Sequence, residues 1–245
     1  MNTLTISNRR GEAGFTLVEL AIVMIIIGLL IGGILKGQEL IANAQLTATV
    51  AQIKGIDGAL STFRDKYSAL PGDMLAPNTR LRDCTAAPCS RAGNGNGRID
   101  APALGSAPSN ANEGSVAFAH MAAADLISGV DINSNINPPA FGALLPEAKI
   151  GGGFWLGFTQ NGNATGVTGM RPGHYLVMNG LVSAVNAASS GLTSTQAAQI
   201  DRKLDDGNGN SGDVQATGSA CVTGAGVYQE NVTTASCALY IRVQG

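Results

Sequence analysis

The sequence predicts an α+β protein in which a long N-terminal α-helix packs on a globular head that contains a small antiparallel β-sheet. Three observations predict this class. An almost uninterrupted apolar run covers residues 15–35, and an apolar stripe with helical spacing continues from it to Tyr67. Short apolar runs of strand length recur after residue 150. The chain between these parts is rich in glycine and proline, which are typical of turns and loops.

Composition limits the classes of function. The chain has 245 residues, of which only 13% are charged, and its formal net charge is -2. Lysine and arginine form no dense cluster along the sequence, and the few aromatic residues are scattered. These features argue against nucleic-acid binding, which usually relies on a basic face with interleaved aromatic residues.

The apolar run at 15–35 is long enough to cross a membrane. Its 21 residues would span about 30 Å as a helix, and only Thr16 and Glu19 in it are distinctly polar. Two arginines precede the run and one lysine follows it directly, so the positive-inside rule places the first residues in the cytoplasm. A secretory signal would be cut after its apolar run, whereas the small-residue candidate here, Ala13-Gly14, comes before it. We therefore expect the apolar helix to survive processing.

The string GFTLVEL, followed by about twenty apolar residues, resembles the type III signal of type IV prepilins and pseudopilins. The resemblance implies that a prepilin peptidase cuts after Gly14 on the cytoplasmic face and N-methylates the new first residue, Phe15. The chain then divides into a leader (1–14), a long helix with a transmembrane half (15–67, with 15–35 in the membrane) and an extracytoplasmic head (68–245). The alternative is a simple signal anchor with a stray glutamate.

Glu19 is the exception within the apolar run. A lone carboxylate in lipid is costly, so an intramembrane acid is by default a functional residue with a partner. The resemblance implies that this partner is the Phe15 amine of a neighbouring subunit, and the pair would set the register of a docking subunit. The helix would then pack a filament core through Leu17, Val18, Ile22, Val23, Ile25, Ile26 and Leu29.

The outer half of the helix carries one apolar stripe, with steps of three and four residues from Leu46 to Tyr67. Glycines at 32–37 are points where the helix could bend. Pro71 and Gly72 then end the helix, because proline disfavours helix in the residue before it. The stripe consists of Leu46, Val50, Ile53, Ile56, Leu60, Phe63 and Tyr67.

The head begins with a long irregular stretch, residues 72–112, and continues with a buried helix at 113–129 that is closed by Gly129. His120 lies in this helix without a cysteine, aspartate or second histidine at ligand spacing, so we expect a packed or half-exposed side chain.

Strands are predicted at 153–159 and 174–182, the second split by a hairpin turn at Asn179-Gly180. A capping box from Thr193 to Gln196 begins a helix that ends near Leu204. Two further strand candidates follow at 226–229 and 237–243.

The cysteines at 84, 89, 221 and 237 lie in the part of the chain expected outside the cytoplasm, where disulfides are favoured over metal binding. Bridges between Cys84 and Cys89 and between Cys221 and Cys237 are the local choice, although crossed connectivities remain open. A disulfide loop near the C-terminal end is also what the resemblance implies.

One loop resembles a calcium-binding site in sequence. In DDGNGNSGD, residues 205–213, the side chains of Asp206, Asn208, Asn210 and Asp213 place oxygen atoms along a glycine-rich loop. The glycine falls one place late and the bidentate glutamate of a calcium loop is missing. Turns in which Asn and Asp bind their own backbone are therefore the alternative. The string AGNGNGRID has a similar alternation of glycine and asparagine with fewer carboxylates.

No nucleophile, phosphate-loop or zinc-protease motif appears, so we expect a protein that is not an enzyme. The resemblance implies a structural subunit of a type IV pilus or a type II secretion pseudopilus. It would move from a single-pass inner-membrane pool into a periplasmic or extracellular filament. Its partners would be the prepilin peptidase and methyltransferase, other pilins and an inner-membrane assembly platform. The alternative is a membrane-tethered minor pilin, adhesin or binding protein whose head recognises a ligand or surface.

Overall fold

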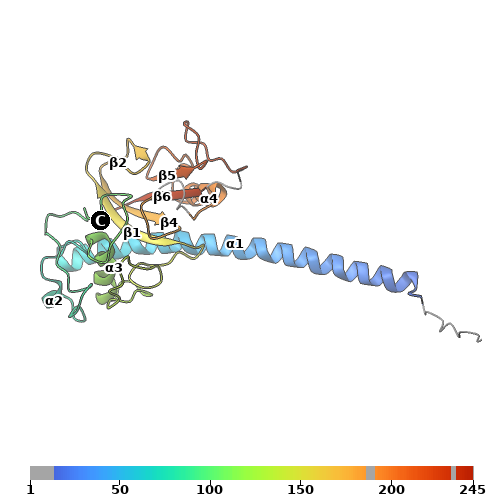
Figure 1. The fold of residues 1–245 in the computed structure, drawn as a ribbon, viewed down its shortest axis with the longest axis horizontal. Helices are drawn as coiled ribbons and strands as arrows, with labels where there is room; N and C mark the ends of the chain where they lie inside the picture. The colour runs from blue at the N-terminus through green and yellow to red at the C-terminus, as the bar shows by residue number, and fades with distance from the viewer. Residues whose placement is uncertain (1–13, 186–190, 233–235, 245) are drawn as a thin grey trace, which may run out of the picture. The chain divides into compact units, whose positions relative to one another are not determined.

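The computed structural model describes residues 14–185, 191–232 and 236–244, and it has the α+β class that the sequence predicts (Figure 1). Contacts divide the chain into two units, with the boundary between Ala44 and Gln45. The outer part of the long helix therefore packs as part of the head. The predicted division into leader, helix and head follows processing rather than packing, and it stays a prediction.

Helix α1 runs from Leu17 to Tyr67 and has 51 residues, so it is about 75 Å long. It is continuous through the glycines at 32–37. The predicted apolar stripe is confirmed: its members are buried from Leu46 to Phe63, and Tyr67 is partly buried against the same core. The helix ends as predicted, because Ser68 adopts a left-handed conformation (φ 49°) just before the Pro71-Gly72 turn.

The head contains a four-stranded sheet in the order β1-β4-β6-β5, in which every neighbouring pair is antiparallel. The largest side chains that it buries are Trp155, Tyr175 and Tyr240, which are fully inaccessible to solvent. A two-stranded hairpin, β2 with β3, lies in the connection between β1 and β4. The strands are β1 (Gly153–Thr159), β2 (Asn163–Ala164), β3 (Val167–Thr168), β4 (Gly173–Asn179), β5 (Val214–Ser219) and β6 (Ser236–Val243).

Three shorter helices complete the head: α2 (Pro77–Arg80), α3 (Glu113–Ala123) and α4 (Ser194–Leu204). The predicted capping box of α4 is confirmed. The Gln196 backbone N–H donates to Thr193 Oγ1 (3.2 Å), and the Thr193 N–H donates to Gln196 Oε1 (3.0 Å). Two of the four orphan N–H groups at this helix end are thereby satisfied.

The predicted hairpin turn at Asn179-Gly180 is wrong. Strand β4 ends at Asn179 and pairs with β1 and β6 on its two sides, so Gly180 ends a central strand. The Asn-Gly signal is local, whereas the partners of β4 come from distant parts of the chain. The predicted strand at 174–182 therefore stops three residues early.

The strand predicted at 226–229 is also wrong, since this segment makes only an isolated bridge between Val222 and Tyr228. Strand β5 at Val214–Ser219 takes the edge position, and its sequence, VQATGS, has too few apolar residues to be recognised. The strand predicted at 237–243 is confirmed as β6.

Helix α3 is shorter than the predicted 113–129. It ends at Ala123, and Asp125 takes a left-handed conformation (φ 60°), which stops the helical hydrogen-bond pattern before Gly129. His120 lies within the helix and is fully buried, so its predicted packed position is confirmed.

Candidate functional site: the N-terminal motif

The first turn of α1 is closed by a hydrogen-bonded pair, Thr16 and Glu19. The Thr16 backbone N–H and the Thr16 hydroxyl both donate to Glu19 Oε2, each at 2.9 Å. In return the Glu19 N–H donates to Thr16 Oγ1 at 3.3 Å. This exchange is a capping box, in which the residue before the helix and the third helical residue satisfy each other's backbone N–H groups.

The sequence signal for this capping box is the spacing T-x-x-E in GFTLVEL. From its position in the apolar run, Glu19 was expected to have only an intermolecular partner, and its bond to Thr16 was not predicted. The carboxylate therefore has a role in the single chain, because it satisfies donors and places negative charge at the positive end of the helix dipole. Its second oxygen, Oε1, makes no hydrogen bond within the described part of the chain.

Gly14 and Phe15 precede the helix and have no regular secondary structure. A Cβ atom built on Gly14 would meet nothing within 4 Å, and the Phe15 side chain is 83% exposed. Both residues at the predicted cleavage point are thus accessible in an irregular segment. The preceding leader residues, 1–13, lie outside the described part of the chain.

After the capping box, α1 exposes aliphatic side chains around its circumference from Leu17 to Leu35. The window of α1 with the highest hydropathy has none of its residues buried, and the helix is long and apolar enough to span a membrane. Exposed apolar surface of this size requires cover by lipid or by other helices. The helix therefore fits the membrane anchor of a prepilin.

These features define a class of protein with an N-terminal apolar helix that fits a membrane anchor. Residues 9–35 match the family model described as the prokaryotic N-terminal methylation motif. The chain therefore carries the type IV prepilin-type signature at its N-terminal end. Comparison with curated proteins and with solved structures gives no match.

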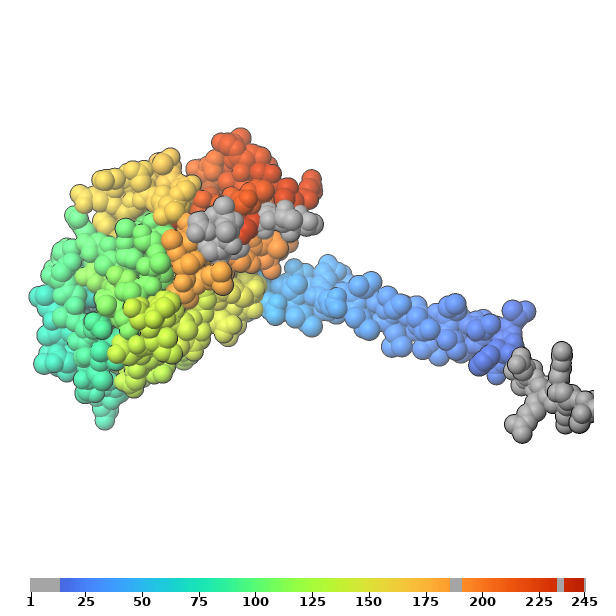
Figure 2. Space-filling view, in the orientation of Figure 1, coloured from blue at the N-terminus to red at the C-terminus, as the bar shows by residue number. Residues whose placement is uncertain are grey.

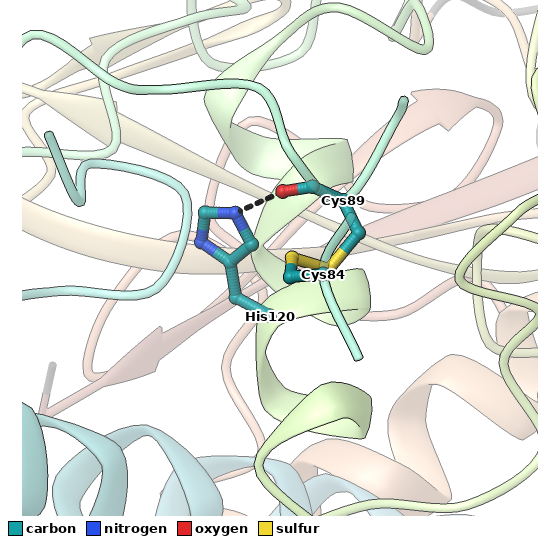
Figure 3. Close-up of side chains that lie close together, drawn as sticks. All are labelled: Cys84, Cys89 and His120. Carbon is teal, nitrogen blue, oxygen red and sulfur yellow. Dashed lines mark hydrogen bonds between the residues drawn. A yellow bond between two sulfur atoms is a disulfide. The ribbon is translucent and has the colours of Figure 1, made fainter. Parts of the chain in front are cut away.

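The cysteines form the two local bridges, Cys84 with Cys89 and Cys221 with Cys237. His120 lies beside the first bridge, although the three residues are not at ligand spacing in the sequence (Figure 3). The Gly72 N–H donates to His120 Nδ1 (2.9 Å), so the ring proton is on Nε2, which donates to the Cys89 carbonyl (2.8 Å).

Burial lowers the pKa of His120 to about 4, so the ring is neutral at physiological pH. Because the two sulfur atoms are bonded to each other, they are not thiolate ligands for a metal ion. His120 instead ties the turn after α1 to the disulfide loop.

In the structure, the side chains predicted to bind calcium contact loop N–H groups and arginines. Asp206 Oδ1 accepts the Asn208 N–H (2.8 Å), and Asn208 Oδ1 accepts the Asn210 N–H (3.1 Å). Asp213 lies near two arginines, with its Oδ1 3.5 Å from Arg171 and 3.6 Å from Arg242. The Asp206 and Asn208 contacts are those expected if this segment forms turns in which Asn and Asp bind their own backbone.

A different carboxylate group lies in the same loop region. Oxygen atoms of Asp201, Asp205 and Asp206 lie within 4.8 Å of one another, and Asp201 is fully buried. Carboxylates at this spacing suit calcium chemically, but hydrogen bonds to Tyr228 and to loop amides already occupy several of their oxygens. Calcium binding stays a prediction.

Two buried carboxylates, Asp73 and Glu113, hold the other Asn-Gly loop, and neither was predicted from the sequence. Asp73 accepts the N–H groups of residues 95, 96 and 97 at 2.6, 3.1 and 2.7 Å. Glu113 accepts those of Asn94 (3.2 Å) and Asp100 (3.1 Å). Burial, with a contribution from Asp100, raises the pKa of Glu113. The loop is therefore shaped from inside by carboxylates.

Proposed function

We propose that this chain is a structural subunit of a type IV pilus or of the related type II secretion pseudopilus. Cleavage would follow Gly14, and the mature chain would assemble from the inner membrane into a periplasmic or extracellular filament. The observation that carries the proposal is the Thr16–Glu19 capping box, within a methylation motif, at the start of an exposed apolar helix.

The two roles that we assign to Glu19 do not compete. Its Oε2 holds Thr16 and closes the first helical turn, while Oε1 remains open. Cleavage after Gly14 would create an amine at Phe15, and the amine of a neighbouring subunit could bind Oε1 without opening the cap. A positive amine with a carboxylate in an apolar helix bundle makes a strong, register-setting pair.

The partners follow from this proposal. A prepilin peptidase and methyltransferase would process the Gly14-Phe15 bond, an inner-membrane platform would extract the helix from lipid, and other pilins would cover its apolar surface. No catalytic role is needed for the head. In the alternative, a tethered minor pilin or adhesin, the same helix anchors a head that recognises a ligand.

The test compares three variants of the motif. Glu19→Ala removes both the cap and the charge, Glu19→Gln retains an oxygen that can accept the Thr16 N–H but removes the charge, and Thr16→Val removes the cap but retains the charge. Each protein is quantified in the inner membrane and in filaments sheared from the cells. Removing one partner of a buried charge pair costs roughly 3 to 5 kcal/mol, whereas losing a cap costs about 1 kcal/mol.

We expect normal membrane levels for all three variants, filaments lost in both Glu19 variants, and filaments retained with Thr16→Val. Filaments at wild-type levels from Glu19→Gln would show that only the cap matters and would remove the charge pair from the mechanism. Normal filaments from Glu19→Ala, or no filament containing the wild-type chain, would favour the tethered alternative.

A further inference from the structure

Two groups of basic side chains in the head differ in their partners. Near strand β5, Arg171 and Arg242 lie beside Asp213, and Arg202 is paired with Glu230. Around α2 and the end of α1, in contrast, five exposed cations make no ion pair with any residue that the structure describes. These are Arg64, Lys66, Arg80, Arg82 and Arg91.

An open groove of about 650 Å³ lies among these cations, and we call it the α2 groove. Its lining includes Arg64, Arg80 and Leu75, a leucine whose side chain is 66% exposed. Asp73 also borders it, but three loop N–H groups already bind that carboxylate. The groove therefore combines two cations that make no ion pair with a described residue, the exposed carboxylate of Asp65 and an exposed apolar side chain.

The opposite charge pattern occurs in the loop at 205–213. Asp205 and Asp206 make no ion pair with a described residue, and Asp206 is exposed. Hydrogen bonds from the Ser211 hydroxyl and the Asn208 N–H lower the pKa of Asp206, which keeps it ionised. This loop connects α4 to β5, far from α2 in the head, as Figures 1 and 2 show.

We propose that the α2 groove binds the 205–213 loop of a second copy of this chain. Arg64 and Arg80 would face Asp206 and the half-buried Asp205 of that copy, and Leu75 would pack against the glycine-rich backbone that follows these two residues. Because the two surfaces lie on different parts of the head, the contact is heterologous, and such a contact repeats along an open helical assembly. This inference rests on the proposed filament function and identifies a head-to-head contact within it.

Charge complementarity favours a peptide over a nucleic acid in this groove. Asp65 lies in the lining next to Arg64, and none of the described residues that line the groove is aromatic. A nucleic acid would need a continuous row of cations for its phosphates and aromatic side chains for stacking. A short acidic segment needs only two cations and tolerates a neighbouring carboxylate. The 205–213 loop has this chemistry.

The first experiment measures peptide binding to the purified full chain in detergent and does not depend on filaments. The probe is a fluorescent peptide of residues 204–213, and its matched control has asparagine at the three aspartate positions. The groove is reversed by Arg64→Glu with Arg80→Glu. The control variant, Lys54→Glu with Lys149→Glu, changes two other exposed lysines by the same charge. Arg64→Glu alone serves if the double variant fails to fold, because Arg64 makes no ion pair with a described residue.

We expect the asparagine peptide, the reversed groove and a rise from about 50 to about 500 mM salt each to weaken binding about tenfold. A peptide with lysine at positions 205 and 206 should bind the reversed groove better than it binds the wild type. Equal binding of both peptides to the wild type, or equal loss in the control variant, would overturn the proposal. A DNA oligonucleotide or acidic polysaccharide that displaces the peptide at lower concentration would overturn the choice of occupant.

The second experiment places a photoreactive residue at Leu75 in cells that make filaments. Mass spectrometry should find it linked to residues 204–213 of another copy. Filaments that form normally while Leu75 links to a different segment would refute this contact and leave the proposed function intact. Absence of the chain from all filaments would refute the proposed function. The peptide experiment alone would then decide whether the α2 groove binds the 205–213 loop.

Discussion

The buried carboxyl group of Asp201 should make the stability of the head depend on pH. Asp201 lies in α4, is fully buried, and accepts the Tyr228 hydroxyl (2.8 Å) and the Gly207 N–H (3.2 Å). Burial is the main cause that raises the pKa of Asp201 from 3.8 to about 6, and the nearby charges of Asp206 and Asp205 add to it. The folded state therefore holds this proton more tightly than the unfolded chain does.

The sign and size of this pH dependence follow from the linkage between proton binding and folding. The stabilisation from the protonated carboxyl is fully present below pH 3.8 and is lost as the pH rises through about 6. A shift of about two pKa units corresponds to about 3 kcal/mol, which is an upper limit because water near the loop screens the charge. For a chain of this size that is about 6 to 12 °C in melting temperature.

Asp201→Asn removes this titration and keeps an oxygen that can accept the Tyr228 hydroxyl. Melting of the mature full chain in detergent is followed between about pH 4 and pH 7 through Trp155, the single, buried tryptophan. We expect the stability of the variant to rise relative to wild type across this range. Tyr228→Phe should instead steepen the decline, because the ionised carboxylate loses a donor. Parallel curves for wild type and Asp201→Asn would refute the reasoning.

Three further predictions concern processing, cross-links and calcium. Gly14→Val should block cleavage because the peptidase must approach the chain closely there, and a full-length mass in wild-type cells would contradict this. Replacing Cys221 and Cys237 by serine should cost about 3 kcal/mol in denaturant unfolding, more than the same change in the shorter disulfide loop, since the larger loop restricts the unfolded chain more. An equal or smaller cost would argue against the chain-entropy account. If calcium binds near 205–213, the head should melt at a higher temperature with calcium than with chelator, and unchanged melting would leave the turn interpretation.

Elements whose signals lie within one segment were predictable. The stripe from Leu46 to Phe63 specifies a buried helical face by its spacing alone, and the Thr193–Gln196 capping box marks the start of α4. The same signal at Thr16 and Glu19 was equally readable. This capping box was not predicted, because the position of Glu19 in an apolar run suggested only a partner in a neighbouring subunit.

Features that depend on distant partners were not predictable. Strand β5 has little apolar character, and it is a strand because β6 pairs with it from Ser236 onward. The Asn-Gly loop near residue 95 resembles a cation site in sequence. Its shape comes from Asp73 and Glu113, each about twenty residues away. No local sequence pattern predicts that a distant carboxylate will bind the loop N–H groups.

The position of β6 has a consequence for the order of events after synthesis. This strand, residues 236–243, lies between β4 and β5 in the middle of the sheet, although it is the last of the four strands to be made. The sheet cannot close until that segment has been made, whereas the apolar helix at the other end of the chain is made first. Under the proposed function, the head would therefore mature on a subunit that is already anchored, and pairing of Cys221 with Cys237 would wait for the same late segment.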